Sequence, residues 1–235
     1  MPAYPPPVAP FPEPADRGAR ARERLLQAAS RIFAEKGFAR ASTREICHAA
    51  ELNVAAINYH FGSKEGLYRE VLLAPVREIA AQFAGCDAPD RPLPEVLRQI
   101  LGAFVLDALD PQTAQMMQLH LREMAEPSAG YVESMVAQVR PHHDAVAALV
   151  ARHIGLNEPD EAVHQLVLGL VAMAQDFSLS ACFYQALAPA LVGDAQALHR
   201  ALDRLVDWGC ALIAHERQRR AHPAMPGPCD KEDSA

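Results

Sequence analysis

Apolar residues recur at helical spacing along most of this chain, and this pattern predicts helices and no sheet. From Arg20 to Lys36 the apolar positions repeat every three or four residues and share one helical face, with arginine and glutamate on the other. These positions are Leu25, Leu26, Ala29, Ile32 and Phe33. Gly37 follows, and glycine commonly closes a helix because it adopts left-handed backbone angles without steric cost. Alternating β-branched runs around Asn-Gly turns do not occur, so the expected fold class is all-α.

The next segment predicts two short helices separated by a turn of three residues. The first spans residues 43–50 and begins at Ser42 or Thr43, and the second spans residues 54–61 with Asn53 as its cap. Two short helices joined in this way form a helix-turn-helix. The small side chains at the start of the second helix allow its backbone to approach base edges in a major groove.

Seven more helices are expected beyond this motif, with prolines at or near several of their ends. Their ranges are 64–83, 94–109, 111–125, 128–140, 141–154, 159–186 and 194–219. The last two carry long apolar stripes, which are Val163, Val167, Leu170, Ala174 and Phe177 on one, and Leu198, Leu202, Leu205, Gly209 and Leu212 on the other. Such stripes are typical of a core face and also of a face that binds another helix.

Both ends of the chain lack this periodicity. Seven of the first sixteen residues are proline, which sustains neither a helix nor a strand ladder. Residues 221–235 are rich in proline, glycine and charge. We therefore expect disordered tails at residues 1–16 and 221–235, without a function of their own.

The charge is distributed unevenly. The chain carries a net charge of −7, yet residues 17–69 hold ten basic and five acidic side chains, a local charge of +5. The remaining residues hold 12 basic and 24 acidic side chains, a charge of −12. A basic module joined to an acidic body indicates that one part of the chain meets a polyanion.

Composition argues against several other classes of protein. No stretch approaches the roughly 20 consecutive apolar residues of a membrane span, and the N-terminus has no basic and apolar regions of a secretory signal. The five cysteines are odd in number and form no Cys-x-x-Cys pair, so neither a disulfide framework nor a zinc site is indicated. We expect a cytoplasmic protein with no membrane partner.

Three segments of the basic module together carry a specific resemblance. They are Leu26–Ala29 with Ile32–Phe38, then Ser42–Ile46, and then Ile57-Asn58-Tyr59-His60-Phe61-Gly62-Ser63-Lys64 through Leu67. In combination they resemble the DNA-binding domain of the TetR family of transcriptional regulators. Asn53–Phe61, with Leu121–Met124 and Pro141, is similar to members that have a CecR/CerR-type C-terminal domain. The resemblance implies a helix-turn-helix DNA-binding domain at residues 17–64 and a helical effector-binding and dimerisation domain at residues 65–220.

The resemblance also implies which residues meet double-stranded DNA. Phosphate contacts fall on Thr43, His60 and Lys64, and base readout falls on the start of the second short helix and its flank. The expected DNA-binding residues are Thr43, Arg44, Asn53, Ala55, Ala56, Asn58, Tyr59, His60 and Lys64.

Two positions depart from the family pattern. Asn58 stands where tyrosine is usual, and Tyr59 follows it. Glu51 stands in the turn where glycine is usual, and a residue other than glycine costs about 1 kcal/mol there if the position has a positive φ.

The helices of the second domain are rich in methionine and aromatic residues. This composition is typical of an adaptable ligand pocket and equally of an ordinary core. The resemblance favours a small-molecule effector site, in which His120 or Glu123 orients a polar group. The expected lining is Phe104, Met117, His120, Glu123, Tyr131, Met173 and Phe177. The resemblance further implies a homodimer in which the last two long helices pair with their dyad copies.

The sequence thus predicts a ligand-responsive dimeric regulator, a repressor that releases a near-palindromic operator when a small molecule binds. An alternative is a DNA-binding regulator gated by thiol oxidation, through Cys182 or Cys210, or by a protein partner. Cys47 is expected to be a buried core residue. No catalytic motif is present, so we expect no enzyme activity and no cofactor. Four histidines are not flanked by other ligands at metal spacing, so no metal site is expected; they are His142, His143, His153 and His164.

Overall fold

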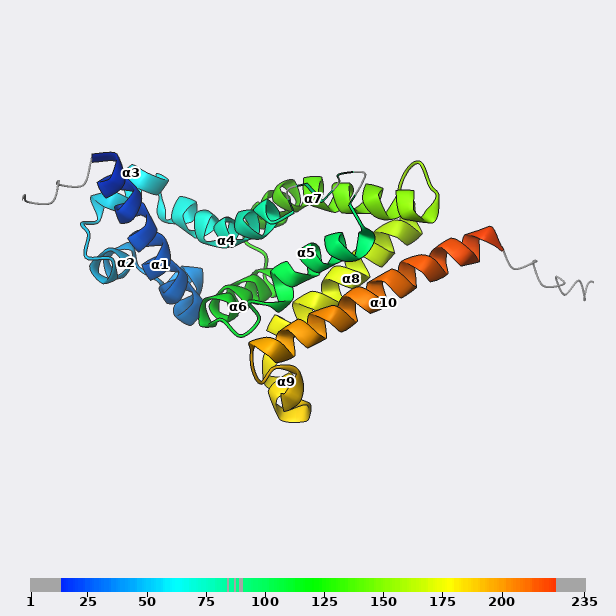
Figure 1. Ribbon diagram of the computed structural model, residues 1–235. Coiled ribbons are helices and arrows are strands. Elements are labelled where there is room, and N and C mark those ends of the chain that lie inside the picture. The colour runs from blue at the N-terminus through cyan, green and yellow to red at the C-terminus, as the bar shows by residue number, and fades with distance from the viewer. Residues whose placement is uncertain (1–13, 84, 87, 89–90, 223–235) are drawn as a thin grey trace, which may run out of the picture. The chain divides into compact units, whose positions relative to one another are not determined.

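The computed structural model describes residues 14–83, 85, 86, 88 and 91–222, and every regular element in this part of the chain is a helix (Figure 1). The all-α fold class is confirmed. Most of the two predicted tails, residues 1–13 and 223–235, lies outside the described residues.

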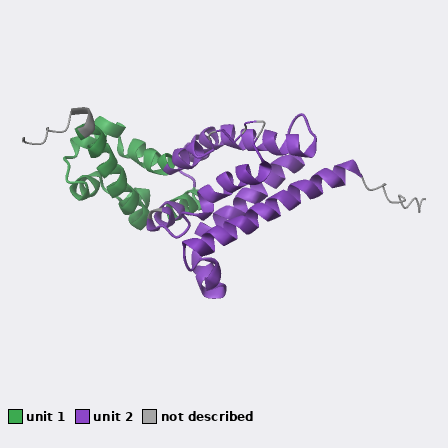
Figure 2. Cartoon of the chain, viewed as in Figure 1, with its two compact units in different colours: residues 1–74, 118–126 green, residues 75–117, 127–235 purple. Residues whose placement is uncertain are grey.

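The chain divides into two compact units, coloured separately in Figure 2. The first, which we call the head, contains residues 1–74 and 118–126. The second, the body, contains residues 75–117 and 127–235. Residues 65–74 and 118–126, which the sequence analysis assigned to the second domain, therefore make their contacts within the head.

The head contains three complete helices and parts of two others. They are α1 (Pro14–Arg40), α2 (Thr43–Ala49), α3 (Ala55–Phe61), the first part of α4 (Lys64–Ala81) and the second half of α6 (Pro111–Ala125). Gly37 has a φ of 74° and breaks the helical path of α1 near its end, as the sequence predicts for a closing glycine. Large apolar side chains from four of these helices are fully buried: Leu25, Phe33, Ile46, Ile57 and Leu67. They hold the short helices α2 and α3 in place, because helices of seven residues are not stable alone.

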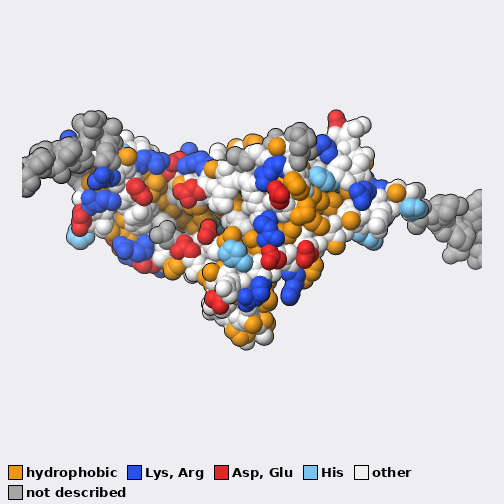
Figure 3. Space-filling model, viewed as in Figure 1, with side chains coloured by type: hydrophobic (Ala, Val, Ile, Leu, Met, Phe, Trp, Pro, Cys, Tyr) orange, Lys and Arg blue, Asp and Glu red, His pale blue; other side chains and the backbone are white. Residues whose placement is uncertain are grey.

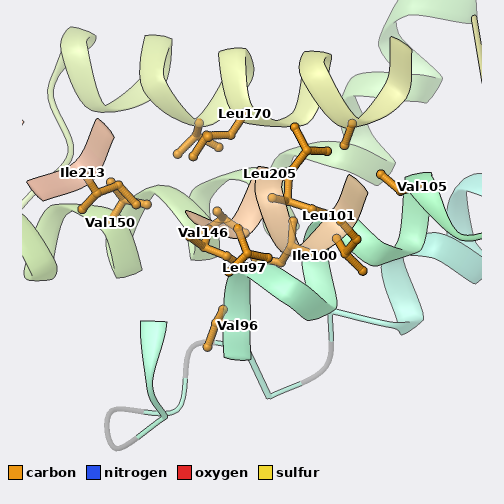
Figure 4. Packing of buried hydrophobic residues seen from close by; sticks show 14 of the residues in the cluster. Val96, Leu97, Ile100, Leu101, Val105, Val146, Val150, Leu170, Leu205 and Ile213 are labelled. Atoms are coloured by element: carbon orange, nitrogen blue, oxygen red, sulfur yellow. The ribbon is translucent and has the colours of Figure 1, made fainter. Parts of the chain in front are cut away.

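The body consists of longer helices around one apolar core. They are α5 (Leu93–Val105), the first half of α6, α7 (Tyr131–Ile154), α8 (Glu161–Leu179), α9 (Ala181–Leu187), the short 3₁₀ helix η1 (Pro189–Leu191) and α10 (Ala195–Ala221). Figure 4 shows side chains of α5, α7, α8 and α10 that meet in this core. Helix α9 buries none of its residues and projects from the ends of α8 and α10 (Figure 1).

Two predicted helix boundaries in the body are wrong. Residues 131–154 form one helix that continues through Pro141, where the sequence analysis placed a break. Conversely, the predicted helix 159–186 is interrupted at Ser180, which has a φ of −107° and a ψ of 20°. The Ser180 hydroxyl donates to the Asp176 carboxylate at 2.6 Å, a side-chain contact that fixes the turn into α9.

The apolar stripes of α8 and α10 pack inside the protomer. All ten of the predicted stripe positions except Leu212 are buried. Gly209 explains how closely the helices approach, because a Cβ at this position would lie 3.0 Å from Leu97 of α5 and 3.3 Å from Leu170 of α8. The opposite faces of α8 and α10 are exposed and carry Leu168 and Trp208. Of the described helices, α8 is the one that is long and apolar enough to cross a membrane by length and composition alone.

Candidate nucleic-acid interface and body pocket

Side-chain caps define where α2 and α3 begin. The Ser42 hydroxyl accepts a hydrogen bond from the backbone N–H of Glu45 at 3.1 Å, which makes Ser42 the cap of α2. The Asn53 side chain accepts from the backbone N–H of Ala56 at 3.1 Å, as the sequence predicts for the start of α3. The hydroxyl of Thr43 is thereby not needed for capping, and the side chain is half-buried in the first turn of α2.

The turn between α2 and α3 contains a strained residue. Glu51 has a φ of 53° and is the one residue other than glycine with a positive φ in the described chain. This is the conformation for which the sequence analysis anticipated a cost. Its carboxylate accepts from the Arg24 guanidinium of α1 at 2.6 Å, so the turn is tied to α1. The pair is exposed and contributes at most about 1 kcal/mol.

Helix α3 presents one face to the core and the other to solvent. Ile57 is fully buried, while Asn53, Ala55 and Asn58 are exposed. The Tyr59 side chain is 84% exposed, and its ring meets the ring of His60 edge-on at 4.8 Å. None of the nine predicted DNA-binding residues is buried, and all nine lie within α2, α3, the turn before α3 and the first turn of α4.

The start of α4 lies directly after α3. The Ser63 hydroxyl caps it by accepting from the Gly66 backbone N–H at 3.1 Å. The Lys64 ammonium lies 4.4 Å from the centroid of the Phe38 ring, a cation–π contact that orients it. The pKa of Glu65 is lowered by its own backbone N–H and by the Ser63 hydroxyl. Gly66 is required here, because a Cβ would overlap the backbone carbonyl of Phe61.

Several basic side chains of the head are neutralised by ion pairs. Arg22 of α1 pairs with Glu70 of α4, and Lys36 pairs with Glu45 of α2. Arg44 and Lys64 form no ion pair with another described residue. Basic and acidic side chains are therefore intermixed over the head, as Figure 3 shows for one face. Arg44 belongs to α2 and Lys64 to the start of α4, the helices that precede and follow α3 in the chain.

The comparisons with known proteins agree with this motif. Residues 25–71 match the family model described as "Bacterial regulatory proteins, tetR family". Residues 93–211, just over half of the chain, match the C-terminal domain of the HTH-type transcriptional dual regulator CecR. This chain belongs to the tetR family. It is therefore a DNA-binding transcriptional regulator, and regulators of this family bind DNA operators and usually dimerise.

Individual relatives of this tetR-family regulator support the same assignment. The CecR protein of Shigella flexneri is 29% identical over 155 residues, which cover 61% of this chain and 69% of CecR. The transcriptional repressor AcnR of Corynebacterium glutamicum is 37% identical over 86 residues, which cover 37% of this chain and 43% of AcnR. The solved structure of SCO4454, a TetR-family regulator of Streptomyces coelicolor, superposes with a TM-score of 0.61 at 20% identity and covers 83% of this chain and 97% of that one, which shows a shared fold.

The predicted effector residues of this tetR-family regulator are divided between the two compact units. His120 and Glu123 belong to the head, whereas the other five belong to the body. Glu123 is only 5% exposed and accepts a hydrogen bond from the Tyr68 hydroxyl of α4 at 2.6 Å. Burial is the main cause of the lowered pKa of His120. Within the head, Glu123 therefore joins α6 to α4.

Two of the predicted effector residues do share a pocket. A pocket of about 700 Å³ lies between α8, α9, η1 and α10, within the body, and Met173 and Phe177 contribute to its lining. The sequence analysis missed the other functional groups of this pocket: Asp176, Tyr184, Arg200, Arg204 and Trp208. No sequence motif marks them, because they come from three helices and each is unremarkable in its own helix.

Proposed function

We propose that this regulator is a dimeric repressor that binds a near-palindromic operator and releases it when a small molecule binds the body. The observation that carries the DNA-binding part is the exposed polar face of α3, next to the unpaired charges of Arg44 and Lys64. The name of AcnR favours repression, since that relative is a repressor. We further propose a cytoplasmic protein that needs no cofactor.

We propose two kinds of contact for the residues of this surface. Thr43, His60 and Lys64 bind phosphates, assisted by Arg44, and so contribute affinity that is independent of base sequence. Base readout comes from the start of α3 and its exposed face, where side chains are small or polar. The residues proposed for readout are Asn53, Ala55, Ala56, Asn58 and Tyr59.

The proposed dimer uses the exposed apolar faces of α8 and α10. Leu168 is 60% exposed and Trp208 is 51% exposed, and Gly169 has open space where a Cβ would be. Burial of such a surface against its dyad copy removes apolar area from water. A dimer also gives two recognition helices that read half-sites one helical turn or more apart. Leu202 and Leu205, which the sequence pattern also offered for this role, are core residues of the protomer.

The DNA-binding proposal is tested by fluorescence anisotropy on the upstream region of the regulator's own gene at several salt concentrations. Lys64→Ala should weaken binding to all sequences and reduce the salt slope by about one, since one phosphate contact is lost. Asn58→Ala should relax the preference at one or two base pairs, at about 1–3 kcal/mol for a lost base contact. Arg217→Ala, an exposed change on α10, is the matched control and should do neither. Wild-type affinity and slope in both head variants would refute the proposed surface.

The dimer proposal is tested by light scattering with a pair of matched substitutions. Leu168→Glu places a charge in the proposed interface and should yield monomers at micromolar concentration that bind the operator weakly. Val132→Glu introduces the same charge at a 52% exposed site on α7 and should remain dimeric. Dimers of undiminished stability with Leu168→Glu would contradict an interface built from α8 and α10.

Release by a ligand requires that the ligand prefer the arrangement that does not bind DNA. To shift the ratio of the released to the DNA-binding arrangement from 1:99 to 99:1, the ligand must bind the released arrangement more tightly by about 5.5 kcal/mol. For the thiol-gated alternative, Cys182 is the better of the two candidates, because it is free and exposed. The pKa values of the Cys47 and Cys210 thiols are raised, mainly by burial, and a raised pKa lowers thiolate reactivity. Operator release by oxidant that is abolished in Cys182→Ser would favour the alternative.

A further inference from the structure

We propose that the body pocket between α8, α9 and α10 binds a carboxylate with an apolar body, so that Arg200 and Arg204 hold the carboxylate. This proposal rests on the ligand-responsive function proposed above and names its ligand class and site. The pocket volume of about 700 Å³ lies within the range of about 300–1,000 Å³ that is typical of small-molecule sites.

The cationic groups of the pocket lining are two arginines of α10. Arg200 and Arg204 both line the pocket from α10 and lie one helical turn apart, and neither forms an ion pair or hydrogen bond with another described residue. Two other arginines of the body are paired, since Arg98 pairs with Asp203, and Arg220 pairs with Asp160 at 2.8 Å. Like charges spaced four residues apart on a helix repel each other. An anion bound between them would relieve this repulsion and accept hydrogen bonds from both guanidinium groups.

The one acidic side chain of the pocket lining is already engaged. Asp176 accepts hydrogen bonds from the Ser180 hydroxyl at 2.6 Å and from the Tyr184 hydroxyl at 2.7 Å. The carboxylate contributes, after burial, to raising the pKa of Tyr184 to about 12, so the phenol stays a neutral donor. The bond also holds the Tyr184 ring stacked on Phe177 at 4.9 Å between centroids. Asp176 therefore shapes the aromatic wall and leaves the two arginines unneutralised.

The remaining lining is apolar and partly exposed to water. Met173, Phe177 and Leu205 form part of it, and Trp208 is half-exposed at its edge. On the face seen in Figure 3, the projection formed by α9 carries hydrophobic side chains at its tip, and basic, acidic and histidine side chains lie where it meets the rest of the body. An apolar ligand body would cover this lining. A neutral ligand would leave the arginines unpaired and a cation would be repelled, so a carboxylate fits best.

Trp208 lines the pocket and is the single tryptophan of the chain, so its emission reports on the pocket. Because Trp208 also belongs to the proposed dimer face, light scattering verifies that the ligand leaves the dimer intact. The full-length protein is titrated with octanoate and with phenylacetate, and Trp208 emission is recorded. At least one carboxylate should give a saturable change in emission. Its neutral counterpart, octanol or phenylethanol, should bind at least tenfold more weakly, and octylammonium should not bind. A tenfold difference corresponds to about 1.4 kcal/mol.

Variants assign the effect to the two arginines. The double variant with Arg200→Gln and Arg204→Gln should weaken carboxylate binding at least tenfold and leave alcohol binding unchanged. Arg217→Gln, an exposed change further along α10, is the matched control and should bind the carboxylate as the wild type does. Arg200, Arg204 and Arg217 are all exposed, and circular dichroism verifies that the variants retain their helices.

Three results would overturn the proposal. One is an absence of saturable binding by either carboxylate up to millimolar concentration, and another is equal binding by acid and alcohol. The third is a double variant whose dimerisation changes while its carboxylate affinity does not, which would assign the pocket to a second copy of the chain. Operator affinity is measured separately. Carboxylate binding without operator release would support this pocket and contradict release of the operator by its ligand. Operator release without a change in Trp208 emission would support ligand-induced release and contradict this pocket.

Discussion

The hydrogen bond between Tyr68 and Glu123 is expected to be a major determinant of the stability of the head. It joins α4 to α6 across 55 residues of sequence, and both side chains are buried, at 6% and 5% exposure. The distance of 2.6 Å between the two oxygens falls in the range of about 2.5–2.7 Å for a hydroxyl that donates to a carboxylate. Replacement of Tyr68 by phenylalanine removes the donor and leaves the buried carboxylate with one partner fewer.

The expected loss follows from these features. Hydrogen bonds to charged groups contribute about 1.5–3 kcal/mol, so Tyr68→Phe should lower the free energy of unfolding by about 2 kcal/mol. For a chain of this size the corresponding fall in Tm is about 4–8 °C. Glu123→Gln should cost less, about 1 kcal/mol, because the amide oxygen still accepts from the tyrosine.

Urea denaturation of both single variants and the double variant measures the interaction. The double-mutant cycle should give a coupling energy of at least about 1 kcal/mol, since the side chains are in direct contact. Tyr59→Phe is the matched control, because it removes a hydroxyl from an 84% exposed tyrosine of the same unit and should change stability by less than about 0.5 kcal/mol. If Tyr68→Phe is as mild as Tyr59→Phe, the reasoning about this bond is refuted.

Three further predictions concern backbone conformation and pH. Gly66→Ala should destabilise the head by several kcal/mol in a urea melt, because the methyl group overlaps backbone, while Gly18→Ala, with open space around it, should not destabilise it. Glu51→Gly should be more stable than Glu51→Ala by about 1 kcal/mol, since alanine retains the strain at positive φ; equal stabilities would contradict strain there. His143 is hydrogen-bonded to His164 at 2.8 Å, and its pKa is lowered by burial and then by His164. The folded protein favours the neutral form of His143. The contribution of this residue to stability is therefore fully present above the unfolded pKa of about 6.5, and it is lost as the pH falls through the pKa of the folded state. His143→Gln should flatten this part of the Tm profile, and an unchanged profile would exclude the pair as its cause.

The sequence predicted the helices of the head well because the signals there are local. Ser42 and Asn53 cap helices through hydrogen bonds to residues three positions away, so the relevant contacts are contained in the sequence neighbourhood. The cost of a positive φ at Glu51 was anticipated from the family resemblance, because glycine is usual at this position of the turn. The inward positions Leu25, Ala29, Ile32 and Phe33 of α1 followed from the same short periodicity.

The sequence predicted less in the body because the deciding contacts are tertiary. Pro141 is a helix breaker by propensity, yet α7 continues through it, since its ring lies on an exposed face and packing elsewhere holds the helix. Periodicity identified an apolar stripe on α10 but did not show whether it meets its own protomer or a copy. Leu202 and Leu205 have the same spacing in either case, and only the structure shows that they lie in the core and that Trp208 does not.

The predicted effector residues also show that local sequence does not reveal tertiary contacts. Glu123 and Phe177 are both residue types that occur in pocket linings. In the structure, Glu123 is hydrogen-bonded to Tyr68 of α4 in the head, whereas Phe177 lines a pocket in the body. A carboxylate that bonds a buried tyrosine and a carboxylate that orients a ligand are indistinguishable in sequence. The arginines of the pocket were missed for the opposite reason, because charged residues on a helix are ordinarily solvated.

Two helices contribute to both compact units, and this division bears on how a body ligand would influence the head. In α4 the division falls between Ala74 and Pro75, and in α6 it falls between Met117 and Gln118. Pro75 has no backbone N–H, so the helical hydrogen bond to the carbonyl of Val71 is missing at this point of α4. Helix α6 has no proline in its interior and is bonded to α4 through Glu123 in the head. A change that begins in the body therefore has two helical routes into the head, besides the loop connection between residues 126 and 127. The route through α6 ends on the buried hydrogen bond that Tyr68→Phe removes. Ligand response in that variant, compared with its operator affinity, separates transmission through α6 from transmission through α4.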